Sequence, residues 1–355
     1  MQKEKLWPRR DFLQMGLLTV LPPLVSPGIL PRAAWRDLGK GQEPRQQGFL
    51  SQEKVQIAGI GGAGGRILRH LRESGFKKAR DIAIDSDSCD LDGVKRGEKV
   101  YLQPQRKQGC CHLPAPLLRQ AVEERRDRLV ALLHGTKSLC IVTGLGGDTG
   151  TAVSPLIAQI AKAQEIFTLA LVILPFPFEG PRRLQKAEEG LLSLREQADC
   201  LMVIPAHGIL PLLKKPANLR ETFHTLDGIA AQALEALYDA FSPPEDALSS
   251  EDYFLEMALT GSTDARIGMG RGTGKDSPLK AVQAALSSPL LEHRPVKGAR
   301  GALLHMSWEK KTTLEEINTA AAVFENALSK ESQLLWVMSD QPDRRNESRA
   351  TLILF

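Results

Sequence analysis

Short apolar runs alternate with amphipathic stretches between residues 51 and 241. Residues 55–60 and 139–143 are short and apolar, which is typical of buried strands, whereas residues 152–163 carry apolar side chains at helical spacing. Strands that alternate with helices predict a parallel, doubly wound α/β sheet. The predicted strands are residues 55–60, 82–85, 139–143, 168–174 and 201–204, and the predicted helices between them are residues 66–73, 116–134, 152–163 and 183–197.

A long amphipathic helix is predicted at residues 219–241, and the proline pair at 243–244 ends it. Beyond it the order of elements changes to a strand, a helix and two strands, which predicts a smaller α+β C-terminal domain. These later elements are residues 298–307, 314–329, 334–339 and 350–355. The predicted units are therefore a leader of residues 1–50, a domain of residues 51–241 that includes the long helix, and a domain of residues 242–355.

Composition narrows the classes of partner. The chain has 355 residues, and its net charge is only +4 with the basic residues spread along it, which argues against a nucleic-acid partner. Its five cysteines show neither zinc spacing nor a disulfide framework, so no metal site is predicted. Cys140 and Cys200 lie inside apolar runs, which predicts buried thiols in a reducing compartment.

The leader, residues 1–50, differs in its residue pattern from the rest of the chain. Residues 8–14 (PRRDFLQ) resemble a twin-arginine export signal, and an apolar stretch at residues 15–30 and a small-residue site at residues 32–34 follow. Three prolines within the apolar stretch argue against a membrane-spanning helix. The alternative is a disordered basic leader on a cytoplasmic protein, and we favour the cytoplasm.

A first glycine cluster, residues 59–65 (GIGGAGG), lies between a predicted strand and a predicted helix. It contains G-x-G-x-x-G, and Asp85 ends the next strand, about where a ribose-binding acid belongs. From Gly59 to Gly64 and Asp85 alone, an NAD-dependent oxidoreductase is one interpretation. A tight turn without any ligand is another.

A second glycine cluster changes that interpretation. Residues 144–151 (GLGGDTGT) follow the third strand and precede a helix, and they resemble the phosphate loop G-G-G-T-G-[S/T]-G of the tubulin/FtsZ family. Residues 175–183 (PFPFEGPRR) resemble the FtsZ run K-P-F-x-F-E-G-x-x-R. Residues 187–190, 201–205, 287–292 and 298–301 continue the pattern in the same order, so residues 53–355 are identified as a member of this family.

The resemblance implies a doubly wound GTPase domain, a long central helix and a smaller α+β domain. It implies GTP or GDP as the ligand, with Mg²⁺ as an accompanying cation, held through backbone amides of the glycine loops because no P-loop lysine motif is present. The positions that match the family's nucleotide site are Gly61, Gly62, Ala63, Gly64, Gly65, Arg66, Gly147, Asp148, Thr149, Gly150, Thr151, Glu179, Arg183, Phe223 and Asp227.

Several of these positions depart from the family pattern. Arg66 and Asp227 each stand where FtsZ has asparagine, and the aspartate could still accept N–H groups of guanine. Asp148 replaces a glycine, and its carboxylate is unfavourable beside a triphosphate unless a cation intervenes. Phe223 matches the aromatic residue that packs on the base, whereas Ala206 replaces a second asparagine that contacts it.

The catalytic loop departs further. In this family the next subunit supplies acidic residues that polarise the attacking water, and here the interval offers Asp252, with Glu251 as second candidate. We therefore expect hydrolysis to be slow or absent. The resemblance implies head-to-tail association with itself or with another FtsZ-like protein, for which this chain could be a non-hydrolysing accessory subunit. No C-terminal peptide for a membrane tether is expected.

Overall fold

The structure is a computed structural model, and the described residues belong to one compact unit. They are residues 55–76, 78–94, 97–103, 113–213, 217–242, 248–249, 259–292, 296–308, 312–340 and 347–355. The leader and both candidate catalytic residues, Glu251 and Asp252, lie outside these ranges.

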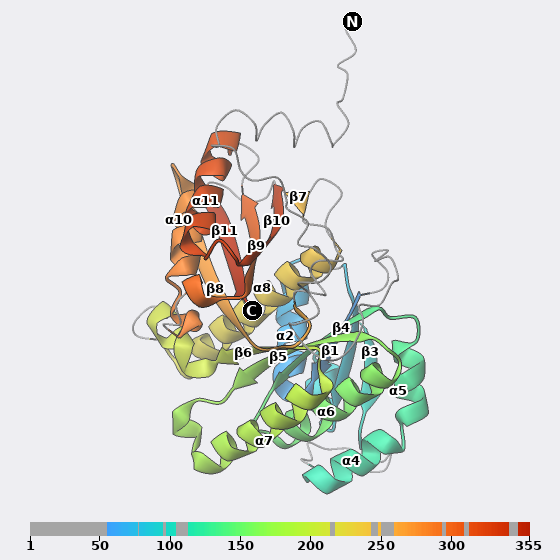
Figure 1. Ribbon diagram of the computed structural model, residues 1–355. Helices are drawn as coiled ribbons and strands as arrows, with labels where there is room; N and C mark the ends of the chain where they lie inside the picture. The colour runs from blue at the N-terminus through green and yellow to red at the C-terminus, as the bar shows by residue number, and fades with distance from the viewer. Residues whose placement is uncertain are drawn as a thin grey trace, which may run out of the picture. The chain divides into compact units, whose positions relative to one another are not determined.

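Six parallel strands form the first part of the sheet, in the order β3-β2-β1-β4-β5-β6 (Figure 1). Strand order reverses between β1 and β4, which is the point where ligands bind in open α/β sheets. The strands are β1 (Val55–Ile60), β2 (Arg80–Asp85), β3 (Glu98–Tyr101), β4 (Ser138–Gly144), β5 (Phe167–Leu174) and β6 (Cys200–Pro205).

The sheet continues beyond β6 as β8-β11-β9-β10-β7 among the described residues. β6 and β8 pair in parallel, β11 runs antiparallel to both β8 and β9, and β9 pairs in parallel with β10. The later strands are β7 (Leu248–Ser249), β8 (Ser262–Thr273), β9 (Gly301–Trp308), β10 (Gln333–Asp340) and β11 (Glu347–Leu354). The predicted fold, a doubly wound sheet followed by a smaller α+β part, is confirmed.

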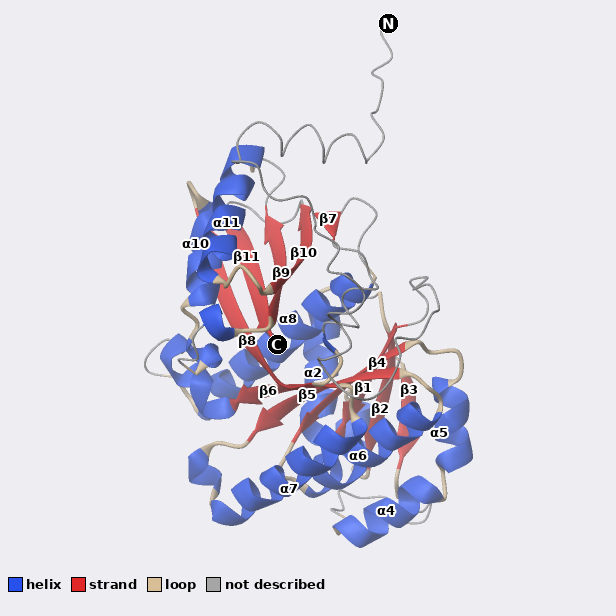
Figure 2. Cartoon of the chain, viewed as in Figure 1, coloured by secondary structure: helices blue, strands red, loops and turns tan. Residues whose placement is uncertain are grey.

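Helices cover both faces of the six-stranded part (Figure 2). Alternate residues of each strand point to opposite faces, so Ile57 of β1 packs in a core with α2 and α8, whereas Ala58 and Ile60 pack in a second core with α4 to α7. The helices here are α2 (Gly61–Glu73), α3 (Ser88–Asp92), α4 (Ala115–Glu123), α5 (Arg126–Leu133), α6 (Asp148–Ala163), α7 (Pro181–Gln197) and α8 (Leu219–Phe241), with 3-10 turns η2 (Pro177–Glu179) and η3 (Ala206–Leu212).

The long helix α8 joins the two parts of the chain. It packs on α2 and also contacts β9, β10 and β11, and its core continues into Leu303, Leu335 and Ile353 of those strands. A separate apolar cluster lies beneath α10 (Ser277–Leu286) and α11 (Leu314–Ala327), next to the 3-10 turns η4 (Pro289–Leu291) and η5 (Val296–Gly298).

Some elements differ from the sequence prediction. Helix α2 begins at Gly61, five residues earlier than predicted, and the single helix predicted at residues 116–134 is the pair α4 and α5. Strands β3 and β8 and helix α10 were not predicted at all. In β8, Gly268, Gly270 and Gly272 alternate along the face that α10 covers, and a Cβ at any of them would collide with a backbone oxygen of that helix. Because α10 packs so closely on this face, β8 has glycines where a predicted strand would have apolar or β-branched side chains.

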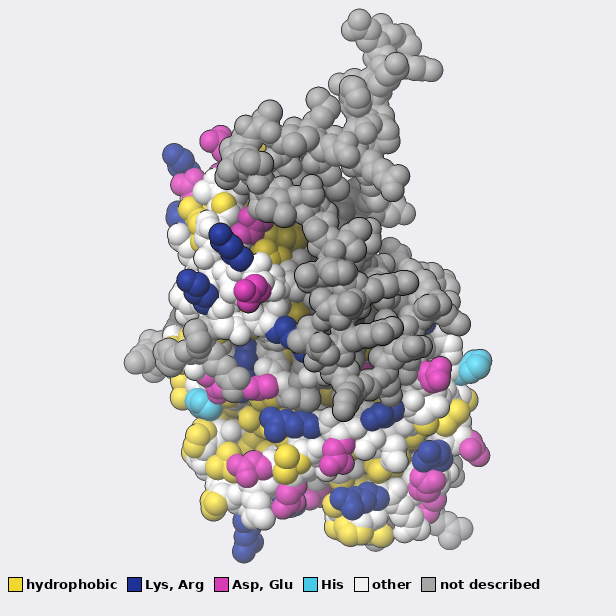
Figure 3. All heavy atoms as spheres, in the orientation of Figure 1, with side chains coloured by type: hydrophobic (Ala, Val, Ile, Leu, Met, Phe, Trp, Pro, Cys, Tyr) yellow, Lys and Arg dark blue, Asp and Glu magenta, His cyan; other side chains and the backbone are white. Residues whose placement is uncertain are grey.

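Cys140 and Cys200 are buried free thiols, as predicted, and burial raises the pKa of Cys140 to about 12. On the described part of the face in Figure 3, Lys and Arg side chains are interspersed with Asp and Glu side chains instead of forming one basic stripe. None of the helices among the described residues combines the length and the apolarity needed to cross a bilayer.

Candidate functional site

The two glycine clusters meet at one edge of the sheet because β1 and β4 are neighbouring parallel strands. Ile60 and Thr143 are register partners at the ends of these strands, and the Thr143 hydroxyl donates to the Ile60 carbonyl at 3.0 Å. Helix α2 begins directly after the first strand, and α6 begins four residues after the second. Two helix N-termini, each with outward-pointing N–H groups, therefore lie side by side.

The first loop is shaped by glycine. Gly61 has φ of +72°, a left-handed conformation that side chains rarely adopt. A Cβ at Gly64 would lie 2.6 Å from the backbone carbon of Gly59 and 2.7 Å from the Val142 carbonyl oxygen, so glycine lets α2 approach both strands. No side chain caps α2, and its first turn holds no acid. Its first N–H groups are free to bind an anion.

The second loop is held in a similar way. Gly146 has φ of +93°, and its N–H donates to the Thr151 hydroxyl at 2.9 Å, which closes the loop. Gly147 precedes α6 without a side-chain cap. A Cβ at Gly61 would lie 3.2 Å from the Gly150 nitrogen, so the two loops are in contact. Together they form a cradle of main-chain amides, which suits phosphate groups.

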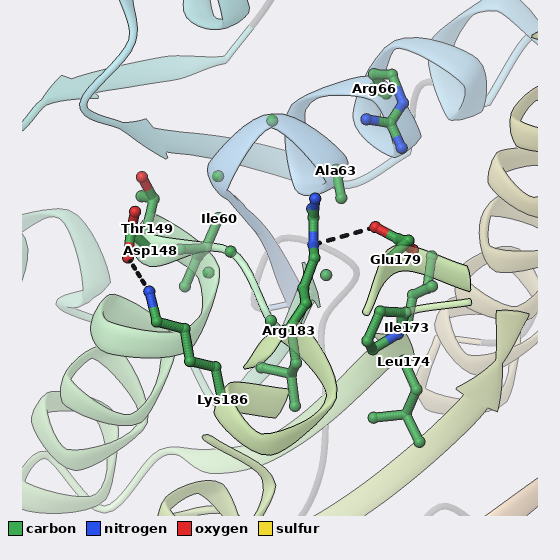
Figure 4. Close-up of a pocket in the computed structure, with 18 of the residues that line it drawn as sticks. Ile60, Ala63, Arg66, Asp148, Thr149, Ile173, Leu174, Glu179, Arg183 and Lys186 are labelled. Atoms are coloured by element: carbon green, nitrogen blue, oxygen red, sulfur yellow. Dashed lines mark hydrogen bonds and ion pairs between the residues drawn. The ribbon is translucent and has the colours of Figure 1, made fainter. Parts of the chain in front are cut away.

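A cavity of about 700 Å³ opens over these loops, which is within the usual range for small-molecule sites (Figure 4). One end is lined by the glycine loops and charged side chains, and the other by apolar groups that include Phe176, Phe223 and Leu226. A nucleotide has the same division, with charged phosphates at one end and a flat base at the other. Among the described residues, no cluster of His, Cys, Asp or Glu could hold a metal ion by itself.

Asp148 has the neutralising cation that a carboxylate beside phosphates needs. Lys186 of α7 approaches Asp148 with Nζ 2.6 Å from Oδ1 (Figure 4). Asp148 also lies in the first turn of α6, where the helix dipole favours negative charge. The substitution of glycine by aspartate in this loop is thus compensated by a lysine that the sequence interpretation did not single out.

Replacing Lys186 with methionine is expected to weaken GTP binding by about threefold to fivefold, because exposed ion pairs contribute no more than about 1 kcal/mol. The Asp148 charge would then act directly against the phosphates. Calorimetric titration measures the effect. Lys162→Met, on the far end of α6, should leave affinity unchanged, and Asp148→Asn should restore the affinity of Lys186→Met. An unchanged affinity in Lys186→Met would contradict this role of the lysine.

Glu179 and Arg183 form a second ion pair at the cavity. Arg183 Nε lies 3.1 Å from Glu179 Oε2, and Glu179 Oε1 accepts from the Phe176 backbone N–H at 2.8 Å. The carboxylate is largely buried, whereas about half of the Arg183 side chain is exposed. Glu179 therefore orients an arginine that remains accessible from the cavity.

At the apolar end, Arg66 lies across the ring of Phe223, with Cζ 5.3 Å from the ring centroid. Its guanidinium forms two hydrogen bonds to Asp227 of α8, from Nε to Oδ2 at 3.0 Å and from Nη2 to Oδ1 at 3.3 Å. Burial raises the pKa of Asp227, and the charge and hydrogen bonds of Arg66 act in the opposite direction.

Asp85, at the end of β2, is a buried carboxylate that lines the cavity. Its Oδ1 accepts from the backbone N–H groups of Ser86 and Asp87, but its Oδ2 has no hydrogen-bond partner among the described residues. Burial raises the pKa of Asp85 to about 6, with a further contribution from the charge of Asp90 and opposition from the two backbone hydrogen bonds.

The structure brings most of the predicted nucleotide residues to this cavity. Gly64, Gly65, Thr151 and Asp227 are not among the residues that line it, and Glu251 and Asp252 lie outside the described residues. The predicted residues that line the cavity are Gly61, Gly62, Ala63, Arg66, Gly147, Asp148, Thr149, Gly150, Glu179, Arg183 and Phe223. Sequence reasoning missed Lys186, Arg182 and Asp90. Helical spacing from Arg183 was the available signal for Lys186.

These features define an α/β protein of the doubly wound class, with two uncapped, glycine-rich helix N-termini at the strand-order reversal. Residues 54–214 match the protein-family model described as the Tubulin/FtsZ family, GTPase domain, and residues 263–354 match the FtsZ family, C-terminal domain.

Individual relatives agree with the family models. The chain is 31% identical over 301 residues to the cell division protein FtsZ of Pseudomonas putida, covering 84% of this chain and 75% of the relative. FtsZ of Methanothermobacter thermautotrophicus is also 31% identical, over 86% of this chain and 79% of the relative. The solved structure of an empty FtsZ dimer from M. jannaschii superimposes with a TM-score of 0.79 at 27% identity, covering 86% and 88% of the two chains. This chain belongs to the tubulin/FtsZ family.

Proposed function

We propose that this protein binds GTP or GDP in the cavity and associates head to tail through its nucleotide-bearing face. The observation that carries the proposal is the pair of uncapped glycine-rich helix N-termini that share one cavity, because such termini bind phosphate through main-chain N–H groups. At the same end Lys186 neutralises Asp148, and Arg183, held by Glu179, remains accessible from the cavity. Mg²⁺, if it accompanies the nucleotide, would be held mainly through the phosphates.

The role that fits best is assembly into filaments, alone or with another FtsZ-like protein, in cell division or a related cytoskeletal process. Relatives named as cell division proteins and the dimeric FtsZ structure support it. A head-to-tail interface that does not close produces a filament. We propose weak or absent GTP hydrolysis, since the interval around Asp252 departs from the family's catalytic motif. We propose the cytoplasm as the place of action, with export through the leader as the alternative.

Gly147 offers a direct test of nucleotide binding. A Cβ there meets nothing within 4 Å, so alanine fits without a clash and a longer side chain begins in open space. Gly147→Asp places a carboxylate at the N-cap of α6, where it would satisfy free N–H groups, stabilise the fold by a few tenths of a kcal/mol and exclude phosphate. GTP affinity is expected to fall at least about tenfold.

The matched control is Gly147→Ala, which adds volume without charge and should bind GTP within about threefold of the wild type. Calorimetry with GTP and GDP, with and without Mg²⁺, gives the affinities, and chromatography of acid-denatured protein identifies any retained nucleotide. Retention of NAD would favour the oxidoreductase interpretation of Gly59–Gly64 and Asp85. Absence of affinity for GTP and GDP in the wild type would refute the proposal.

Sedimentation then tests assembly. The wild type is incubated with GTP alone, and separately with an active FtsZ from another source. Pelleting alone supports a self-assembling protein, whereas pelleting only with the second protein supports an accessory subunit. Phosphate release at a rate similar to that of the active FtsZ would contradict the proposed weakness of hydrolysis.

A further inference from the structure

The apolar end of the cavity already contains a flat, hydrogen-bonding group. The guanidinium of Arg66 lies over the Phe223 ring and donates twice to the Asp227 carboxylate. Arg66 and Phe223 line the cavity, but Asp227 does not. The Asp227 side chain is 8% exposed and that of Arg66 is 37% exposed, so the arginine lies between the carboxylate and the open space.

These contacts are the ones that a guanine base would make. The N1–H and N2–H groups of guanine form a planar pair of donors that suits a carboxylate. The Nε–H and Nη2–H groups of arginine form a similar planar pair and bind carboxylates through two parallel hydrogen bonds. A guanidinium also stacks on aromatic rings. Arg66 therefore presents a pair of N–H donors to Asp227 and a flat surface to Phe223, as guanine would.

We propose that Arg66 is an internal occupant of the base subsite and sets its selectivity. This inference rests on the proposed function, because it concerns the base end of the same nucleotide site. Guanine reaches Asp227 only by displacing Arg66, so the base adds little net affinity. The chain holds a nucleotide mainly through its phosphates and discriminates weakly between guanine and adenine.

Binding of a base at this end exchanges the contacts of Arg66 for those of the base. A base that displaces Arg66 gains a stacking contact and two hydrogen bonds, but it breaks a charge-assisted pair of the same kind. Asp227 is buried, so its charge must keep a partner throughout. Adenine presents no matching pair of donors to a carboxylate, but in the wild type guanine has little advantage either. Removing the arginine would leave Asp227 available to guanine alone.

The test uses the full chain and compares GTP with ATP by calorimetric titration. The wild type is expected to bind the two within about threefold of each other. Arg66→Asn is expected to bind GTP about tenfold more tightly than the wild type, with ATP changed by less than about threefold. Arg69→Asn is the matched control, since Arg69 lies on the same helix and does not line the cavity, and it should behave like the wild type.

Arg66→Asn leaves Asp227 charged without its arginine, so thermal unfolding is measured in parallel. If that variant does not fold, Arg66→Asn with Asp227→Asn removes both charges and replaces the carboxylate with an amide oxygen that can still accept from guanine. The preference of the double variant for GTP over ATP is expected to exceed that of the wild type by about tenfold.

Four results decide between the inference and the proposed function. A wild type that already prefers GTP over ATP by more than about tenfold, unchanged by Arg66→Asn, overturns the inference and leaves the proposed function standing. Loss of GTP and ATP affinity together in Arg66→Asn also overturns it, since the arginine would then bind phosphate. If only the Arg66 variants bind GTP, the proposed function of the wild type fails, and so does the inference that the wild type holds a nucleotide through its phosphates. If no variant binds any nucleotide, both fail.

Discussion

Replacing Asp239 with asparagine is expected to lower the free energy of unfolding by about 3 kcal/mol at pH 7, because buried ion pairs are costly to break from one side. Asp239 lies on α8 and is 1% exposed. Its two oxygens contact Lys78 Nζ at 2.8 Å and His305 Nε2 at 3.2 Å. Lys78 follows α2, whereas His305 lies on β9, so one carboxylate ties the first part of the sheet and its helices to the C-terminal strands.

The pH dependence of this effect has a defined sign. Burial alone would raise the pKa of Asp239, but the hydrogen bonds and charges of His305 and Lys78 outweigh it and lower the pKa. A lowered pKa means that the contribution is present above the ordinary aspartate pKa of about 4 and is lost as the pH falls through the folded-state value. The difference in the free energy of unfolding between wild type and Asp239→Asn should therefore become smaller at acid pH.

Urea denaturation at a series of pH values measures both effects. The control is Asp127→Asn, an exposed aspartate on α5, which should change the free energy of unfolding by less than about 0.5 kcal/mol. An Asp239→Asn variant as stable as the wild type at pH 7 would show that Asp239 does not stabilise the junction.

Replacing Asp85 with asparagine is expected to have the opposite effect, stabilising the protein by about 2 kcal/mol at pH 7. The pKa of Asp85 is raised to about 6, chiefly by burial. With a raised pKa, the folded state holds its proton longer than the unfolded state as the pH rises, so stability is lost between about pH 4 and pH 6. Asparagine carries no charge to bury, and its Oδ1 can still accept from Ser86 and Asp87.

Thermal and urea unfolding at pH 4 and pH 7 test this expectation. Wild type and Asp85→Asn should be similar at pH 4, where Asp85 is already neutral, and should separate at pH 7. Asp92→Asn, at the exposed end of the nearby α3, should match the wild type at both pH values. GTP affinity at pH 7 should also increase in Asp85→Asn, because a negative charge is removed from the lining of the cavity. If the stability gained by Asp85→Asn over the wild type were smaller at pH 7 than at pH 4, burial of the Asp85 charge would not be what costs stability.

Sequence periodicity predicted five of the six strands in the first part of the sheet and missed β3. Strands β1, β2, β4, β5 and β6 are short apolar runs, and α8 is a long amphipathic stretch between a turn and a proline pair, so each carries its own local signal. β8 carried no such signal, because its alternating glycines are selected for contact with α10 and not for strand propensity.

The candidate site divides in the same way. The two glycine loops could be located from the sequence because left-handed turns and close helix–strand packing require glycine locally. The ion-pair partners of the charged residues could not be located from the sequence. Asp148 was judged unfavourable beside a phosphate until the structure placed Lys186 next to it, 38 residues along the chain.

The amino-acid sequence by itself determined the α/β order of the chain, the two phosphate-loop candidates and membership of the tubulin/FtsZ family, because these depend on neighbouring residues in fixed order. Tertiary structure alone decided that Arg66 meets Asp227, 161 residues away, over the ring of Phe223. An ion pair between two helices cannot be predicted from the periodicity of either helix. Its existence depends on the packing of α2 against α8, and only folding brings those two helices together.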